Sequence, residues 1–157
     1  MIKNLTSASD SITLKLLLLV VLLCSAAVSF STQSTELHGV LVTSKQSDIT
    51  KLKRKDIRRI FLGIKPMNNS LVNKPVLNLS NQKAYTLFLK NIMFLTETGY
   101  KRKLIKRIFR QGADEIHSID SSAGLIKYLS AHPNDISFMS KEDALKNPNL
   151  RIIQALW

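Results

Sequence analysis

The sequence predicts an α/β fold in which a layer of helices covers a mixed or parallel sheet. Short apolar runs at residues 37–43, 75–79, 135–139 and 150–156 are typical of buried strands. Between them, apolar residues recur at the spacing of amphipathic helices. Strands that alternate with helices are characteristic of α/β layers, and 157 residues are the length of one domain.

The first 29 residues are predicted to be a secretory signal peptide. Lys3 and Lys15 precede an apolar run at residues 16–23, and small residues follow it. This order of charged, apolar and small residues is typical of an export signal. The apolar run is shorter than the roughly 18 residues of a membrane-spanning helix, so we expect cleavage, after Ala27 or Ser29, with an uncleaved anchor as the alternative.

A polar linker at residues 30–36 is expected to lead into a single domain over residues 37–157, located in the periplasm. Cys24 is the one cysteine of the sequence. A cysteine after an apolar run suggests a lipoprotein, but the preceding Leu23 is larger than the residue that lipoprotein processing requires. If cleavage falls as predicted, the mature chain contains no cysteine, so it can have no disulfide, no reactive thiol and no thiolate metal site.

Positive charge is concentrated in the middle of the chain. Residues 51–110 hold 16 Lys and Arg against two acids, whereas residues 111–157 hold four against six. Such asymmetry predicts attraction to phosphate groups, acidic lipids or an acidic protein face, and solvated surface lysines are the alternative explanation.

After the first strand, at residues 37–43, the stretch 53–62 is predicted to be a helix that ends at Gly63. Its buried face is expected to hold three apolar residues: Ile57, Ile60 and Phe61. A loop at residues 64–74, which contains Pro66, precedes the strand at 75–79.

A longer helix is predicted from residues 80–82 to about Leu95, with Ser80 as its N-cap. Its inner face is expected to comprise Ala84, Leu87, Phe88, Asn91 and Leu95. A second, basic helix is predicted at residues 100–111 and closed by Gly112. Its apolar face is expected to comprise Tyr100, Leu104, Ile105, Ile108 and Phe109, and its outer face Lys101, Arg102, Lys103, Lys106, Arg107 and Arg110.

Shorter elements follow. A polar link through Asp120 leads to a helix that ends at His132, and the strand at 135–139 is expected to alternate around Phe138. A helical turn at 141–146 then precedes the last strand, at 150–156.

At this point the chain resembles a known family. Residues 52–63, which end Ile-Phe-Leu-Gly, are similar to the "leucine, polar residues, Ile-Phe-x-Gly" signature of periplasmic phosphate-binding proteins of ABC transporters, in the type 2 periplasmic-binding-protein superfamily. Residues 109–112, Phe-Arg-Gln-Gly, resemble its Phe-x-Gly with one residue added. The segment from Ser121 through Pro133 to Phe138 resembles its stretch ending Pro-Gly-x-Ile-Gly-Tyr.

The resemblance covers residues 37–156, about half the size of the usual two-lobed chain, and implies a single-lobe periplasmic-binding-protein-like domain. It implies an exported, non-catalytic solute-binding protein that binds phosphate or another small oxyanion. Its partner is then a membrane transporter or sensor, or a second copy that completes the cleft. The family's phosphate motif, Arg-x-x-x-Ser-Gly-Thr, is not kept: Asn78 stands for the Arg, and Gln82, Lys83 and Ala84 stand for Ser-Gly-Thr.

Physical reasoning still predicts an anion site at the start of the longer helix. The amides of Asn81, Gln82 and Lys83 lie at a helix N-terminus, where unpaired N–H groups favour an anion. Ser44 and Ser121 are expected to face the same edge, as strand-to-helix turns do in open α/β sheets. Ordinary capping by Ser80 and Ser121 is the alternative.

The second hypothesis is a cationic interaction module for an acidic protein, a polyanion or a membrane surface. It would use five basic residues of the second helix: Lys101, Lys103, Lys106, Arg107 and Arg110. Nucleic acid is disfavoured, because an exported protein rarely meets it and no aromatic stacking platform is visible.

An enzyme is not expected, and no cofactor is predicted. Asp114 and Glu115 with His117 come nearest to a metal-binding cluster, but ordinary solvated acids in a loop explain them better. The sequence has no glycine-rich phosphate loop.

Overall fold

The computed structural model describes residues 37–64 and 71–157, which belong to one compact unit, Glu36–Trp157. The predicted signal peptide and linker, and residues 65–70 of the predicted loop with Pro66, lie outside the described residues. In the part of the chain that is described, no helix has the length and apolar character needed to cross a membrane.

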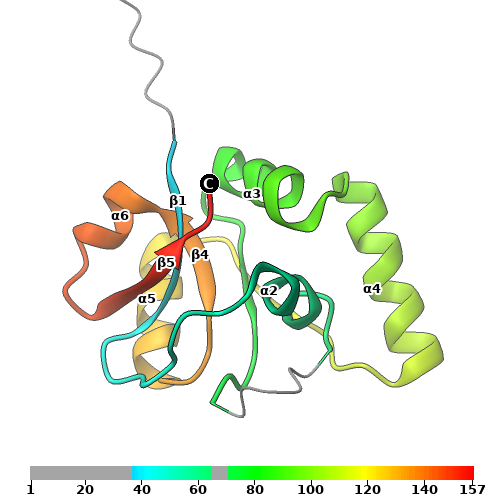
Figure 1. Ribbon diagram of the computed structural model, residues 1–157, viewed down its shortest axis with the longest axis horizontal. Coiled ribbons are helices and arrows are strands. Elements are labelled where there is room, and N and C mark those ends of the chain that lie inside the picture. Colours follow the sequence, from blue (N-terminus) through cyan, green and yellow to red (C-terminus); the bar gives the residue numbers. More distant parts are fainter. Residues whose placement is uncertain (1–36, 65–70) are drawn as a thin grey trace, which may run out of the picture. The chain divides into compact units, whose positions relative to one another are not determined.

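Strands and helices alternate along this unit, as predicted (Figure 1). In chain order the elements are β1 (Gly39–Ser44), α2 (Arg54–Ile60), β2 (Val76–Asn78), α3 (Gln82–Phe88), η1 (Leu89–Met93), α4 (Glu97–Gln111), β3 (His117–Ile119), α5 (Ser122–Ala131), β4 (Ser137–Ser140), α6 (Lys141–Leu145) and β5 (Leu150–Ala155). Here η1 is a π-helical turn that continues α3. Among the described residues, β3 was not predicted as a strand, because its segment was expected to be part of a polar link.

The strands form two hydrogen-bonded sheets, β4-β1-β5 and β2-β3, which an isolated bridge joins into one mixed layer. β1 lies between β4 and β5 and is antiparallel to both, with Leu41 opposite Phe138 on one side and Gln154 on the other. β2 pairs in parallel with β3. A parallel bridge between Pro75 and Ile136 connects β2 to β4, and the Val76 N–H donates to the Ile136 carbonyl oxygen (2.9 Å). The predicted mixed sheet is therefore confirmed.

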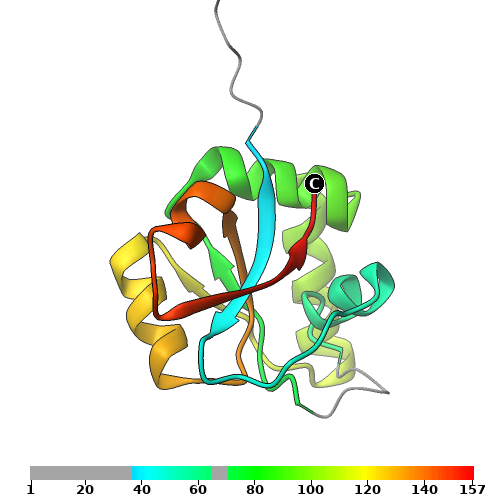
Figure 2. The ribbon, with the colours of Figure 1, turned by 60° about the vertical axis from the view of Figure 1, so that its left-hand side comes forward.

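Helices cover both faces of this sheet (Figures 1 and 2). Side chains of β1 alternate between the faces: Leu41 enters a hydrophobic cluster with α2, α3 and η1, whereas Val40 and Val42 enter a second cluster with α5 and α6. Because both faces are covered, β4 is buried along its whole length. Along this segment Ile136 and Phe138 enter the first cluster and Met139 enters the second, so the predicted alternation around Phe138 is confirmed, with both faces buried.

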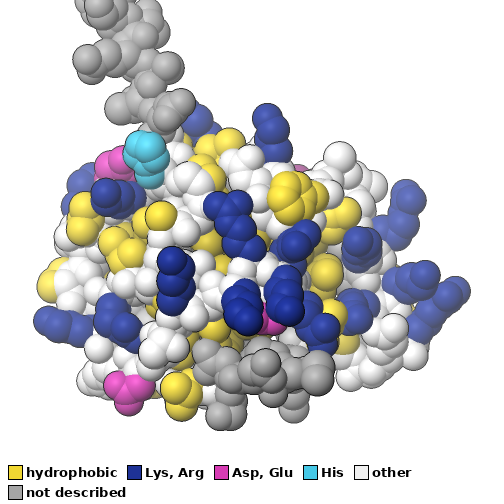
Figure 3. Space-filling model, in the orientation of Figure 1, with side chains coloured by type: hydrophobic (Ala, Val, Ile, Leu, Met, Phe, Trp, Pro, Cys, Tyr) yellow, Lys and Arg dark blue, Asp and Glu magenta, His cyan; other side chains and the backbone are white. Residues whose placement is uncertain are grey.

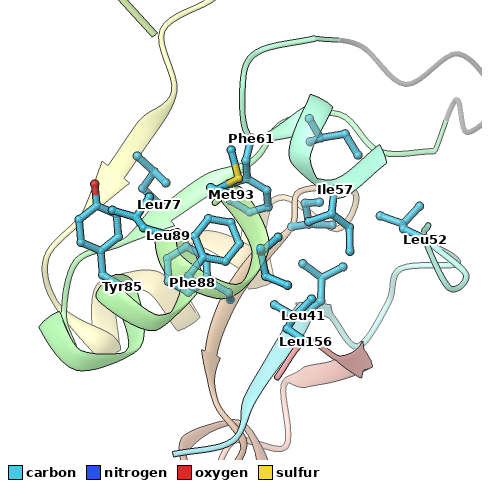
Figure 4. Packing of buried hydrophobic residues seen from close by; sticks show 14 of the residues in the cluster. Leu41, Leu52, Ile57, Phe61, Leu77, Tyr85, Phe88, Leu89, Met93 and Leu156 are labelled. Atoms are coloured by element: carbon cyan, nitrogen blue, oxygen red, sulfur yellow. The ribbon is translucent and has the colours of Figure 1, made fainter. Parts of the chain in front are cut away.

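Three phenylalanines of the larger cluster contact one another, and two of them, Phe61 and Phe88, are labelled in Figure 4. The rings of Phe88 and Phe138 stack with centroids 4.0 Å apart, and Phe61 meets Phe88 edge-on at 4.8 Å. Ile57, Ile60 and Phe61 are buried, so the predicted inner face of α2 is confirmed.

Gly63 follows α2 with a φ of +72°, a left-handed conformation that suits glycine at a helix end.

The inner face predicted for the longer helix is partly wrong. The residues that it buries are Ala84, Tyr85, Phe88, Leu89, Ile92 and Met93, whereas Leu87 and Asn91 are only half-buried. In η1 the backbone hydrogen bonds span five residues instead of four, as from the Phe94 N–H to the Leu89 carbonyl oxygen. This wider turn rotates the later residues away from the positions that a regular α-helix gives them.

Candidate functional site

Three parallel strands end at one edge of the sheet, and a helix follows each of them. β2 leads into α3, β3 into α5 and β4 into α6. The Leu79 N–H donates to the Ile119 carbonyl oxygen (2.8 Å), so the turns before α3 and α5 lie side by side. We call this the carboxyl edge; it comprises residues 79–83, 120–123 and 140–143. Two of the predicted anion-site residues, Asn81 and Ser121, are brought together there, and Gln82 and Lys83 follow Asn81.

Each of these helices is capped by a polar side chain. Asn81 Oδ1 accepts from the Ala84 N–H (3.0 Å), Ser121 Oγ from the Gly124 N–H (3.2 Å) and Ser140 Oγ from the Asp143 N–H (3.1 Å). The Asn81 side chain thus takes the Ala84 donor. The N–H groups of Gln82 and Lys83 come earlier in the first turn, where a helix offers no backbone acceptor.

The predicted N-cap, Ser80, is wrong by one residue. Asn78 donates through Nδ2 to the Phe138 carbonyl oxygen (2.9 Å), which fixes the orientation of its carboxamide. Asn78 Oδ1 then accepts both from Ser80 Oγ (2.6 Å) and from the Ser80 N–H (3.0 Å). The Ser80 side chain is therefore hydrogen-bonded to Asn78 of β2, and Asn81 is the N-cap of α3 instead.

Ser44 does not share this edge. β1 is antiparallel to β4, so Gly39 lies opposite Ser140 at the carboxyl edge, and Ser44 at the far end of β1 lies at the other edge. The expectation that Ser44 faces the same edge as Ser121 is wrong, because it assumed that β1 runs in the same direction as its neighbours. Ser44 is buried there, and its Oγ accepts from the Gln46 N–H (3.4 Å).

Side-chain charge at the carboxyl edge is mixed. Lys83 and Lys141 are exposed, but Asp120 and Glu142 are exposed there as well, and Asp143 belongs to the first turn of α6. An anion at this edge would be attracted by the helix N-termini and by Lys83, and repelled by the carboxylates. Any binding there would therefore rest on backbone donors more than on net charge.

The predicted interaction residues lie on α4. Lys101, Lys103, Lys106 and Arg110 are exposed, and Arg107 is half-buried. Lys101 Nζ lies 2.7 Å from Glu97 Oε1. Within residues 37–64 and 71–157, no other basic residue of α4 makes an ion pair. Figure 3 shows Lys and Arg side chains gathered over α2 and along α4, with few acidic side chains between them.

The apolar face predicted for this helix is wrong at two positions that matter for function. Ile105 is 55% exposed and Phe109 is 84% exposed, whereas Tyr100 is the residue of α4 that is fully buried. The reason lies in helix geometry: nine residues are two and a half turns of about 3.6 residues each, so Phe109 points away from the side that Tyr100 anchors. Sequence reasoning missed the exposed pair, although counting turns from Tyr100 would have found it.

A hollow of about 290 Å³ opens at the edge opposite the carboxyl edge, where β2 and β3 begin. Its lining includes Lys74, Asp114, Glu115, His117 and Tyr128. Burial, and a hydrogen bond from the Tyr128 hydroxyl to Asp135 Oδ2 (3.0 Å), raise the pKa of Tyr128. Among the described residues, no three His, Cys, Asp or Glu side chains come together in a group that would hold a metal ion.

The fold is a mixed α/β layer that is also found in solved structures. Among solved structures, PstS from Borrelia burgdorferi is similar at a TM-score of 0.50 and 17% identity, over 75% of this chain and 47% of PstS. An ABC-type phosphate transport receptor from Vibrio cholerae matches at a TM-score of 0.45 and 11% identity, over 75% of this chain and 46% of the receptor. The chain thus spans about half the length of the structures that it matches. No family model and no curated protein matches the sequence.

Proposed function

We propose that this chain is an exported, non-catalytic, solute-binding-like protein whose carboxyl edge binds a small oxyanion such as phosphate. The observation that carries the proposal is the hydrogen bond between Leu79 and Ile119, which sets the starts of α3 and α5 side by side. Backbone donors at two neighbouring helix N-termini would then be available to one anion, and such donors favour anion binding. The motifs that resemble phosphate-binding proteins, and the fold similar to PstS, agree with this proposal.

In this proposal Gln82 and Lys83 supply backbone N–H groups, Lys83 adds a formal charge, and Ser121 adds a hydroxyl. The edge is open, since Gln82, Lys83 and Ser121 are all exposed. A second wall would come from a partner: a membrane transporter or sensor, or a second copy of the chain. An open site of this kind binds weakly, because much of the ligand stays in water.

Calorimetric titration with phosphate and with sulfate at low salt tests the proposal. Lys83→Glu replaces an attraction of about 1 kcal/mol at 4 Å in water with an equal repulsion, so the affinity should fall by ~2 kcal/mol, or about 30-fold. Lys90→Glu is the matched control, because Lys90 is also exposed and lies seven residues further along the same helical stretch. The proposal would be contradicted if no heat of binding and no rise in the melting temperature were measured at any anion concentration below millimolar.

The second candidate function is a cationic interaction module. It is favoured by α4, where exposed Lys and Arg side chains lack ion-pair partners among the described residues apart from the Lys101–Glu97 pair. Reversing Lys103, Lys106 and Arg107 together should abolish capture of a polyanion, whereas capture by the carboxyl-edge variant Lys83→Glu should be retained.

A further inference from the structure

We infer that α4 docks this protein on the surface of an anionic phospholipid bilayer. The helix does so through the side that holds Arg102, Ile105, Lys106 and Phe109, which is called the outer face from here on. Ile105 and Phe109 enter the interface between head groups and acyl chains, while Arg102 and Lys106 contact lipid phosphates. The inference rests on the second candidate function, since it names what the cationic surface binds and adds apolar residues to that surface.

The apolar part of this face is Ile105 with Phe109. They are four residues apart, so they lie on the same side of the helix. They are 55% and 84% exposed, whereas most large apolar side chains of the described unit are buried. Two neighbouring apolar side chains on the water-facing side of a helix gain free energy when an apolar phase covers them.

The cationic part surrounds that pair. Arg102 is three residues before Ile105, and Lys106 is three residues before Phe109, so both lie beside the pair on the helix surface. Both are exposed, and neither has an ion-pair partner within the described residues. Glu97, the one acidic residue of α4, is already paired with Lys101. The outer face therefore combines apolar side chains with uncompensated positive charge.

A bilayer matches this combination better than the alternatives do. Interfacial helices bury apolar side chains about 5–10 Å deep while Lys and Arg contact anionic head groups, and each cation near such a surface contributes about 1 kcal/mol. A nucleic acid or another soluble polyanion would attract the cations but offer no apolar phase to Phe109. α4 also stands at the margin of the described unit, with no strand or helix outside it (Figure 1), as a helix that lies on a surface requires.

Co-sedimentation with lipid vesicles tests the inference. Residues 36–157 are suitable, because they form a compact unit that contains both hydrophobic clusters and lacks the N-terminal apolar run. We expect binding to vesicles of equal parts phosphatidylcholine and phosphatidylglycerol, no binding to phosphatidylcholine alone, and weakening as salt is added. Phe109→Ser should lower the affinity at least about tenfold. Leu145→Ser, at an apolar residue of α6 that is 68% exposed, is the matched control and should leave it unchanged.

Charge is tested in the same way. Lys106→Glu should lower vesicle affinity, whereas Lys146→Glu, at another exposed lysine, should have little effect. The inference is overturned if the mixed vesicles are not bound, or if Phe109→Ser binds them as the parent does. It is also overturned if poly-glutamate, a stand-in for an acidic protein, is captured while the vesicles are not. Phosphate titration of Phe109→Ser should match the parent, so failure here leaves the oxyanion proposal separately testable.

Discussion

Tyr100 is the residue that anchors α4, and removing its hydroxyl is the sharpest test of how this helix is held. The side chain is fully buried, and its hydroxyl donates to the Phe61 carbonyl oxygen at 2.6 Å. Tyr100→Phe keeps the ring and leaves that buried carbonyl without this donor. Such a loss costs about 1–3 kcal/mol, so the free energy of unfolding should fall by ~2 kcal/mol.

The assay is urea unfolding, followed by the fluorescence of Trp157, the single tryptophan of the chain. At an m value of about 2 kcal/mol/M, this loss moves the midpoint down by about 1 M. Tyr85→Phe is the matched control: Tyr85 is also buried, but its hydroxyl makes no hydrogen bond to any described residue and points away from the cluster in Figure 4. That substitution should stay within about 0.5 kcal/mol of the parent. Equal effects of the two substitutions would refute the argument that the hydroxyl of Tyr100 holds α4 to the end of α2.

Two further predictions concern the same unit. In Gly39→Ala the new methyl group would overlap the indole ring of Trp157, so the ring must move and its Nε1–H must leave the Leu37 carbonyl oxygen (2.8 Å). We expect the free energy of unfolding to fall by about 1–3 kcal/mol and the tryptophan emission to shift to the red. Unchanged emission would contradict this packing. Burial raises the pKa of Tyr100 far above its usual value of 10.0. The unfolded chain therefore loses this proton near pH 10 while the folded chain keeps it, so stability is full below that pH and falls above it. Urea midpoints measured from about pH 8 to about pH 11 should fall less steeply for Tyr100→Phe than for the parent, and parallel profiles would contradict this explanation.

Apolar periodicity was sufficient to predict most of the fold. β1 and α2 follow directly from runs whose side chains are buried as their spacing implies, including Ile57, Ile60 and Phe61. β3 was not predictable in this way, because His117 and Ser118 are exposed and polar. That strand forms because its backbone pairs with β2, and backbone pairing leaves no mark on the pattern of apolar residues.

The candidate sites were predicted less well, for two physical reasons. The sequence of a strand does not determine whether it runs parallel or antiparallel to its neighbours. Because β1 is antiparallel to β4, Ser44 lies at the edge opposite Ser121. The apolar face predicted for a helix also does not reveal how much of that face the neighbouring elements cover. On α4 only the side near Tyr100 is covered, so Ile105 and Phe109 face water. By contrast, Asn81 and Ser121 were correctly predicted to share an edge, since each follows a strand of the parallel part of the sheet.

An amide-resolved titration by NMR can show whether an oxyanion binds at the carboxyl edge. Phosphate would be added to residues 36–157 at low salt while the backbone ¹H–¹⁵N correlations are followed. We expect saturable shifts at Gln82, Lys83 and Ser122, the first-turn amides of α3 and α5, and an affinity about 30-fold lower in Lys83→Glu. Shifts confined to the cationic residues of α4, or no saturable shift at those three amides, would contradict the proposal.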